Sequence, residues 1–443
     1  MKIMKKVICF LLSAMLLWSC GPATTAEHSA HPEWTYNTVV YELNVRQLTP
    51  DSSFAAAEAY LPALKELGVD IVWVMPPYPI GVKGRKGTLG SYYAISNYCE
   101  INPEFGTMED FDSFLATAHE LGLRVILDWV ANHTSPDALW VDGKPADWYI
   151  RDENGETVVQ YDWTDIAKLN YESEEMRAEM LKCMRFWVDK GVDGFRCDVA
   201  YEIPLDFWRH SFAELRKVNP DLYLLAEAEK PELHTEAFDA TYAWELHHLM
   251  NDMAQGKKSI GDLKEYIARD AEALPDAYRL MFTSNHDENS WNGTEFERMG
   301  DAVHCMAALT FVLPNGQPLI YTGQEFGYDH AFEFFEKDTM TSLEPNEYTE
   351  FYKSLCKFRH DHPALASGER GGKFEYIEGV PENVLAFTRT AGDDCVVCLF
   401  NFSPEEMEFE VAEPKISAQL EPWGYILASA NGLFVSGNWF DGE

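Results

Sequence analysis

The most constraining feature of this sequence is a long alternation of short apolar segments with amphipathic segments. The apolar segments are typical of strands, and the amphipathic ones, with apolar residues three and four apart, are typical of helices. Such alternation over more than 300 of the 443 residues predicts a parallel sheet. About eight units fit a (β/α)8 TIM barrel better than an open doubly wound sheet, and no GxGxxG motif opens any of the helices. The predicted strands are residues 39–45, 71–75, 124–130, 194–200, 223–228, 279–284 and 318–322, and the predicted helices are 54–67, 108–121, 174–190, 205–218, 301–313 and 350–358.

Two regions depart from this alternation. Residues 134–168, after the third strand, are polar and too long for an ordinary loop of such a barrel, so we expect an insertion at its mouth. After Gly371 short alternating strands replace the helices, which predicts a small antiparallel domain. We therefore assign residues 34–365 to the barrel with its insertion, and 366–443 to a C-terminal β-sandwich-like domain.

Acidic residues follow four of the predicted strands. They are Asp128, Asp198, Glu227 and Asp287. A single acid at the end of a strand is usually a cap or a salt-bridge partner. Four of them at one end of a barrel, where barrels place their active sites, indicate a catalytic centre.

The surroundings of two of these acids predict different protonation states. Arg196 lies two residues before Asp198, so we expect it to lower the pKa of that carboxyl, as suits a nucleophile. Glu227 follows an apolar run, which we expect to raise its pKa, as suits a proton donor. Paired carboxyls of this kind are what glycoside hydrolysis requires, and in retaining enzymes they lie about 5–5.5 Å apart.

The motifs around these acids resemble those of the α-amylase family of glycoside hydrolases, from about Trp34 to the C-terminus. The matching segments are DWVANH at 128–133, GFRCD at 194–198, Glu227, NHD at 285–287, NPEFGT at 102–107 and GQPLIYTGQE at 316–325. The resemblance implies retaining hydrolysis of α-1,4-glucosidic bonds in starch-type glucans or malto-oligosaccharides. Exo-acting α-glucosidase activity and transglycosylation on the same site remain alternatives.

The resemblance also implies roles for single residues. Asp198 would form the covalent glycosyl intermediate, Glu227 would donate and later withdraw the proton, and Asp287 would grip the sugar hydroxyls. The remaining roles are substrate binding by Tyr93, His133 and His286, orientation of the nucleophile by Arg196, and support of the site by Asp128. No cofactor is required, although Asn132 matches a calcium ligand of the family and so allows a structural calcium ion.

Three features depart from the family pattern and leave the substrate open. The family often has a Lys-His pair shortly after the nucleophile, where this chain has VAYE at 199–202. Asn97 replaces an aspartate, and Glu229 replaces an aromatic residue two positions after the acid. Aromatic residues of the insertion, namely Trp148, Tyr161 and Trp163, are candidates for sugar-binding subsites or for core packing.

The charge of the chain restricts its partners. Asp and Glu number 73 against 35 Lys and Arg, a net charge of −38, which disfavours nucleic acid but not neutral sugars. Two non-catalytic alternatives are a glycan-binding lipoprotein and an interaction protein of the kind that accompanies transporters. Both tolerate the loss of catalytic carboxylates, and here none is lost.

The N-terminus is typical of an exported lipoprotein. Lys2, Lys5 and Lys6 precede an apolar run at 7–18 that is too short to span a membrane. Residues 1–20 would be the signal peptide, with Cys20 as the lipidation site, and 21–33 a tether to a bacterial envelope membrane. The seven cysteines beyond Cys20 have no regular spacing, which argues against a disulfide framework. Nothing in the sequence fixes the oligomeric state.

Overall fold

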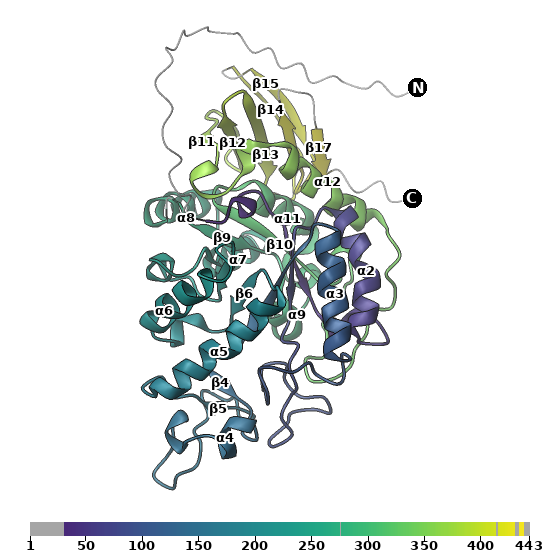
Figure 1. Ribbon diagram of the computed structural model, residues 1–443. Coiled ribbons are helices and arrows are strands. Elements are labelled where there is room, and N and C mark those ends of the chain that lie inside the picture. Colours follow the sequence, from purple (N-terminus) through teal and green to yellow (C-terminus); the bar gives the residue numbers. More distant parts are fainter. Residues whose placement is uncertain (1–30, 275, 413–414, 430–433, 438–443) are drawn as a thin grey trace.

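The fold is a closed barrel of parallel strands surrounded by helices, with a separate antiparallel sheet at one end (Figure 1). The computed structural model describes residues 31–274, 276–412, 415–429 and 434–437. The predicted signal peptide, Cys20 and most of the tether lie outside these residues. The barrel order is β1-β10-β9-β8-β7-β6-β3-β2, as expected for a TIM barrel. Its strands are β1 (Val40–Leu43), β2 (Ile71–Val74), β3 (Arg124–Trp129), β6 (Gly194–Cys197), β7 (Tyr223–Ala226), β8 (Ala240–Tyr242), β9 (Tyr278–Met281) and β10 (Gly316–Tyr321).

The helices begin and end where local chemistry allows. In α2, Ser53 caps the first turn by accepting from the Ala56 N–H, and Gly68 ends the helix at φ 100°. A capping box of Thr107 and Asp110 starts α3. The helices are α1 (Val45–Leu48), α2 (Phe54–Leu67), α3 (Met108–Glu120), α4 (Leu139–Gly143), α5 (Glu174–Lys190), α6 (Leu205–Arg216), α7 (Trp244–Ala254), α8 (Ile260–Ala273), α9 (His286–Asn292), α10 (Glu295–Met299), α11 (Val303–Val312) and α12 (Glu347–Asp361). No helix within the described residues is long and apolar enough to cross a membrane.

The structure corrects several predicted elements. The predicted strands at 194–200, 223–228 and 279–284 end early, at Cys197, Ala226 and Met281. The predicted strand at 39–45 ends at Leu43, because the Asn44 side chain accepts from the Gln47 N–H and caps the short helix α1. Strand β8, Ala240–Tyr242, and the helices α7 and α8 were not predicted. A strand of three residues is too short to show a period.

The insertion after β3 lies at the end of the molecule opposite to the antiparallel sheet (Figure 1). It is closed by the short strands β4 (His133–Thr134) and β5 (Ala167–Lys168), which pair antiparallel, and it contains α4. Trp148 is buried in this insertion, edge-on to Trp140 at 5.3 Å between ring centroids. The insertion thus has a small core of its own.

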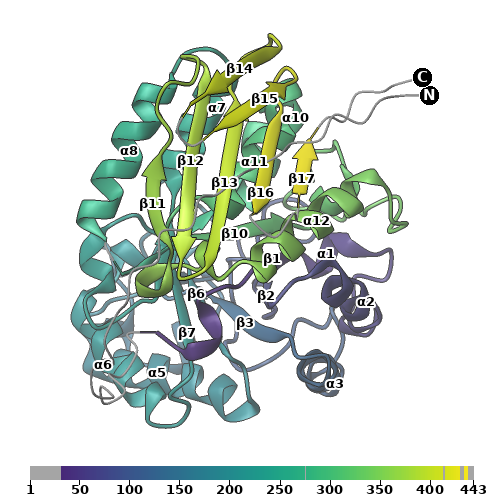
Figure 2. The ribbon, with the colours of Figure 1, turned by 90° about the horizontal axis from the view of Figure 1, so that it is seen from above.

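The C-terminal strands form two antiparallel sheets (Figure 2). One has the order β11-β12-β13-β16-β17, and the other pairs β14 with β15. A buried arginine joins this region to the barrel: Arg389 of β12 donates to Val312 O of α11. The strands are β11 (Lys373–Tyr376), β12 (Val384–Ala391), β13 (Asp394–Asn401), β14 (Met407–Val411), β15 (Ile416–Leu420), β16 (Tyr425–Ser429) and β17 (Phe434–Gly437).

Candidate active site

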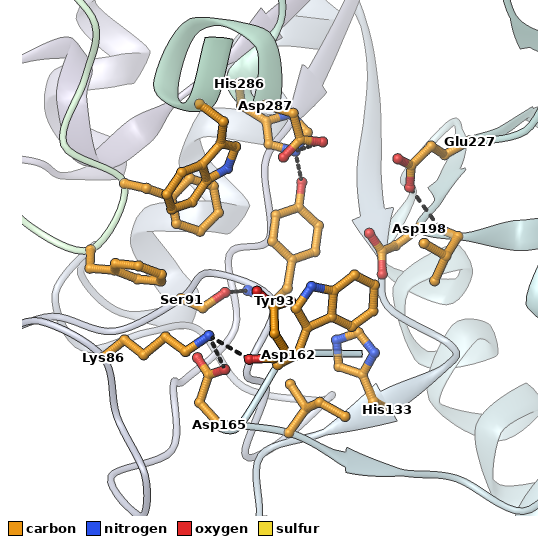
Figure 3. A pocket seen from close by; sticks show the side chains of 16 residues that line it. Lys86, Ser91, Tyr93, His133, Asp162, Asp165, Asp198, Glu227, His286 and Asp287 are labelled. Atoms are coloured by element: carbon orange, nitrogen blue, oxygen red, sulfur yellow. Dashed lines mark hydrogen bonds and ion pairs between the residues drawn. The ribbon is translucent and has the colours of Figure 1, made fainter. Parts of the chain in front are cut away.

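A pocket of about 510 Å³ opens at the carboxyl ends of the barrel strands (Figure 3). All three predicted catalytic carboxylates, Asp198, Glu227 and Asp287, line it. Its remaining walls come from the loop after β2, the insertion, α9 and the loop after β10. The other lining residues are Lys86, Ser91, Tyr93, His133, Asp162, Trp163, Asp165, Ile166, Val199, His286, Trp291, Phe334 and Phe335.

The ends of β6 and β7 place two of these carboxylates. Strand β6 ends at Cys197, and β7 ends at Ala226, so Asp198 and Glu227 each stand immediately after a strand. Both strand ends are tied down, because the Asp198 N–H donates to Trp129 O and the Glu227 N–H donates to Cys197 O, each at 3.0 Å. The two side chains therefore emerge side by side from neighbouring strands, which are paired in register.

Val199 holds the Glu227 carboxylate in place. Its φ of 36° lies in the left-handed region, which is uncommon for a β-branched residue. In this conformation its N–H donates to Glu227 Oε2 at 2.8 Å. A strained backbone at a functional position is retained when the surrounding structure fixes it and the site uses it.

Arg196 is the buried centre of the site. Its Nη1 donates to Asp128 Oδ1 at 2.9 Å and to Asp198 Oδ1 at 3.3 Å, and its Nη2 lies 3.1 Å from Glu227 Oε2. The Nε donates to Tyr242 Oη at 3.0 Å, and the guanidinium lies 4.9 Å from the centroid of the Trp73 ring. One cation thus contacts three carboxylates and fixes their relative positions.

The pKa shifts of the two central carboxyls correct part of the prediction. Burial raises the pKa of Glu227, as predicted. The expectation of a lowered pKa for Asp198 was wrong, because burial, and then the charge of Glu227, raise it well above its usual range. The charge of Arg196 lowers the pKa of Asp198, as predicted, but only partly offsets the increases due to burial and Glu227. Charging two neighbouring buried carboxyls together is costly, which is the physical reason for the upward shift of the Asp198 pKa.

A hydrogen-bonded chain crosses the floor of the pocket. His286 Nδ1 lies 2.5 Å from Glu42 Oε1, and its Nε2 lies 2.7 Å from Tyr93 Oη, which in turn donates to Asp128 Oδ2 at 3.0 Å. Burial lowers the pKa of His286, but the charges of Asp287 and Glu42 raise it to about 9. His286 is therefore a cation at neutral pH, with both ring nitrogens donating.

Glu42 was not identified from the sequence, although a signal was present. Glu42 is a fully buried acid within the otherwise apolar strand β1. An acid at an apolar strand is the same signal that identified Asp128, Asp198 and Glu227. Tyr93, which is buried, also stacks against Phe334 at 6.3 Å. The lining side chains Lys86, Trp291, Phe334 and Phe335 were not predicted either, because they lie in loops or in the short helix α9, whose positions depend on the folded barrel.

His133 lies on the insertion side of the pocket. Burial lowers the pKa of this histidine to about 3, so its ring is neutral, and Trp163 packs on it at 5.5 Å. Trp163 lines the pocket and contacts the exposed ring of Tyr161, whereas Trp148 belongs to the core of the insertion.

The surroundings of Asn132 do not fit a calcium site built on carboxylates. Its side-chain amide donates to Gln160 Oε1 at 2.7 Å. No group of three or more His, Cys, Asp or Glu side chains that could hold a metal ion occurs among the residues that the structure describes. Calcium binding stays a prediction.

The sequence matches a family of known enzymes over most of the barrel. The model of the α-amylase catalytic domain matches residues 58–363. The chain belongs to the α-amylase family. It is thus an α-amylase-type glycoside hydrolase, as its strand-end motifs predicted.

Individual relatives agree with this assignment. The chain is 29% identical over 398 residues to α-amylase MalA of Haloarcula japonica, a match that covers 84% of this chain and 56% of the relative. The crystal structure of an α-amylase from Lactobacillus plantarum has a TM-score of 0.79 at 29% identity, covering 89% of this chain and 98% of that one. The maltogenic α-amylase AmyB of Thermotoga neapolitana has a TM-score of 0.77 at 30% identity, covering 88% of both chains.

Proposed function

We propose that this family member hydrolyses α-1,4-glucosidic bonds of starch-type glucans or malto-oligosaccharides with retention of the anomeric configuration. The observation that carries the mechanism is the contact of one guanidinium, Arg196, with both Asp198 and Glu227. A shared cation requires the two carboxylates to lie close together. This favours the short separation of retaining enzymes over the longer one that leaves room for a water molecule in inverting enzymes.

In the first half of the reaction Asp198 attacks the anomeric carbon while Glu227 protonates the departing oxygen. Arg196 contacts Oδ1 of Asp198, which leaves Oδ2 for the attack. Val199 and Arg196 hold Oε2 of Glu227, which leaves Oε1 to carry the proton. Burial raises the pKa of Glu227, which suits this carboxyl to carry the proton when substrate is bound.

In the second half Glu227 acts as the base. It withdraws a proton from water, whose oxygen attacks the anomeric carbon and releases Asp198, so that two inversions give net retention. A sugar hydroxyl in place of water would give transglycosylation. Asp287 and the cation of His286 bind hydroxyls of the sugar whose anomeric carbon reacts, and the neutral His133 contributes a further hydrogen-bonding group.

Two kinds of observation support a glucan substrate. The relatives described above are named as α-amylases, one of them maltogenic. The pocket combines buried polar groups with aromatic rings, namely Tyr93, Trp163, Trp291, Phe334 and Phe335, against which the C–H faces of sugars pack. All three carboxylates are present and share one pocket, which favours an enzyme over a glycan-binding protein without activity.

We also propose that the protein is exported and anchored by a lipid on Cys20. This proposal rests on the basic, apolar and small-residue order of residues 1–20. Radiolabelled palmitate incorporated into the full-length chain, and lost in Cys20→Ala, would support the anchor; equal labelling of both chains would contradict it.

The roles of the two carboxylates are separated by the choice of leaving group. Asp198→Asn should lose turnover by several orders of magnitude on both maltoheptaose and α-maltosyl fluoride. Glu227→Gln should lose turnover on maltoheptaose, but on the fluoride it should release a fast burst of about one fluoride per enzyme, because fluoride departs without protonation while hydrolysis of the glycosyl-enzyme lacks its base. Azide, which attacks the anomeric carbon without a base, should then restore turnover on the fluoride. A Glu227→Gln variant with no burst would contradict its role as the acid, and an active Asp198→Asn would contradict the nucleophile.

A further inference from the structure

One end of the pocket is crossed by a short segment, residues 81–90, in the loop that follows β2. At one side the N–H groups of Val82 and Lys83 donate to Asp137 Oδ2, at 2.8 and 2.9 Å. At the other side the Thr88 N–H donates to Glu336 Oε1, at 2.9 Å. The segment is therefore fixed to the insertion on one side of the pocket and to the loop after β10 on the other.

Lys86 stands at the middle of this segment, and its side chain reaches into the pocket (Figure 3). Its Nζ lies 3.5 Å from Asp165 Oδ1 and 3.4 Å from Asp162 O, both in the insertion. The same ammonium lies 5.8 Å from the centroid of Phe335, on the opposite wall. Lys86 thus spans the pocket from the insertion to the loop after β10.

The aromatic wall beside Lys86 continues the closure. Phe335 packs against Phe334 at 5.2 Å between ring centroids, and Trp291 packs on both rings, at 5.2 and 5.7 Å. The Leu89 N–H donates to Phe335 O at 3.0 Å, which joins this wall to the segment that carries Lys86.

The closed end lies away from the proton donor. In Figure 3 Lys86 and Glu227 stand at opposite sides of the pocket, with Tyr93 and Asp198 between them. The acid of a glycosidase protonates the oxygen of the leaving sugar, so Glu227 marks the side on which the leaving group lies. The sugar that stays bound to the nucleophile extends the other way, toward Lys86.

Two exposed aromatic rings lie on the side that adjoins Glu227. Tyr161 is 61% exposed and Tyr201 is 41% exposed. The Tyr161 hydroxyl donates to Glu202 at 2.8 Å, and Glu202 directly follows Tyr201 in the chain. Tyr201 in turn lies two residues after Val199, whose N–H holds the Glu227 carboxylate. Exposed rings at this rim suit stacking of a longer leaving chain.

We propose that the bridge formed by Lys86, Asp165 and Phe335 closes the glycone end of the site, so that the enzyme removes short units from the non-reducing ends of chains. The inference rests on the proposed hydrolysis of α-glucans and adds the direction and mode of attack. Lys86 is a specificity-determining residue, because it limits the sugar chain beyond the reacting unit without touching the scissile bond.

The test compares two forms of p-nitrophenyl α-maltoheptaoside, one unmodified and one blocked by a 4,6-benzylidene group on its non-reducing sugar. The wild type should cleave the unmodified substrate at least about tenfold faster than the blocked one, since a pocket with a closed end rejects the added group. Lys86→Ala should remove much of this preference by gaining activity on the blocked substrate. Lys83→Ala, on the same segment but with its exposed side chain outside the pocket lining, should keep the wild-type preference.

Each result has a distinct meaning. Equal cleavage of both substrates by the wild type would overturn the closed glycone end while leaving α-glucan hydrolysis intact. Cleavage of neither would contradict the proposed function, and with it the inference. If Lys86→Ala keeps both the wild-type melting temperature and the wild-type preference for the unmodified substrate, Lys86 is not the barrier. Phe335→Ala then tests the other half of the bridge. An unchanged preference in that variant as well would overturn the bridge as a whole.

Discussion

The imidazole of His286 lies 2.5 Å from the carboxylate of Glu42, and both side chains are buried below the pocket. Glu42 belongs to β1 and His286 begins α9, so this hydrogen bond joins elements that are far apart in sequence. Through Tyr93 it continues to Asp128 and Arg196. The charge of His286, and hence the orientation of Asp287 next to it, depends on this partner.

Replacement of Glu42 by glutamine should change the pH dependence of activity on its alkaline side. The charges of Asp287 and Glu42 overcome burial and raise the pKa of His286 to about 9, so loss of the Glu42 charge lowers it. We expect the alkaline limb of kcat/KM to move down by about one pH unit or more in Glu42→Gln. A pH–rate profile of both proteins measures this.

The same pair makes stability depend on pH. The pKa of His286 is higher in the folded chain than in the unfolded chain, so its contribution is complete below the ordinary histidine value and is lost as the pH rises through about 9. The melting temperatures of wild type and Glu42→Gln should therefore differ most below the ordinary histidine pKa and converge as the pH rises through about 9. A difference that stays constant across this range would show that His286 is neutral in the wild type.

Arg196→Lys tests the guanidinium as the common partner of the carboxylates. An ammonium keeps the charge but cannot contact Asp128, Asp198 and Glu227 together. We expect kcat to fall by about 100-fold, as for a small misplacement of reacting groups. The exposed Arg185 of α5 provides the matched control, since Arg185→Lys should leave kcat unchanged. An active Arg196→Lys would show that charge alone suffices.

Two tryptophans of the insertion should have different roles. Trp163 lines the pocket, so Trp163→Ala should raise KM by about tenfold with little loss of stability. Trp148 is buried against Trp140, so Trp148→Ala should lower the free energy of unfolding by about 3–5 kcal/mol. Steady-state kinetics and urea unfolding of both variants distinguish them; the reverse pattern would contradict the assignment.

The junction between the barrel and the C-terminal sheet should depend on Arg389. This side chain is buried and donates to Gly372 O, Val312 O and Ala366 O. In Arg389→Met these carbonyl groups lose their donors, which should cost about 2 kcal/mol or more in the free energy of unfolding. Urea unfolding measures the change, and an unaltered midpoint would show that water replaces the lost donors.

The barrel could be predicted because its signals are local. Periodicity identified α2 and α5 with their observed bounds, at 54–67 and 174–190. Strand β8 escaped because three residues carry no period, and the first strand was extended too far because the cap formed by Asn44 depends on its own backbone angles. Short elements are defined by their neighbours rather than by their own sequence.

The site could be predicted where a side chain belongs to a strand, follows it directly or lies in a motif of the family. Asp128, Arg196, Asp198 and Glu227 meet one of the first two conditions, and Arg196 contacts the other three. Asp287 lies in a motif at the start of α9 and lines the same pocket as Asp198 and Glu227. Lys86 and Phe335 come from separate loops and Trp291 from the short helix α9, and no sequence pattern relates them before the barrel closes. The net pKa shift of Asp198 could not be predicted either, because it depends on burial and on Glu227 as well as on the adjacent Arg196.

The stereochemistry of the first product tests the two-step displacement through Asp198. Proton NMR of maltoheptaose, recorded within minutes of adding enzyme lacking residues 1–20, distinguishes the α from the β anomer at the new reducing end before mutarotation mixes them. Attack by Asp198 followed by water requires that the α anomer appears first. The β anomer as first product would show a single displacement by water, and Asp198 would then not be the nucleophile.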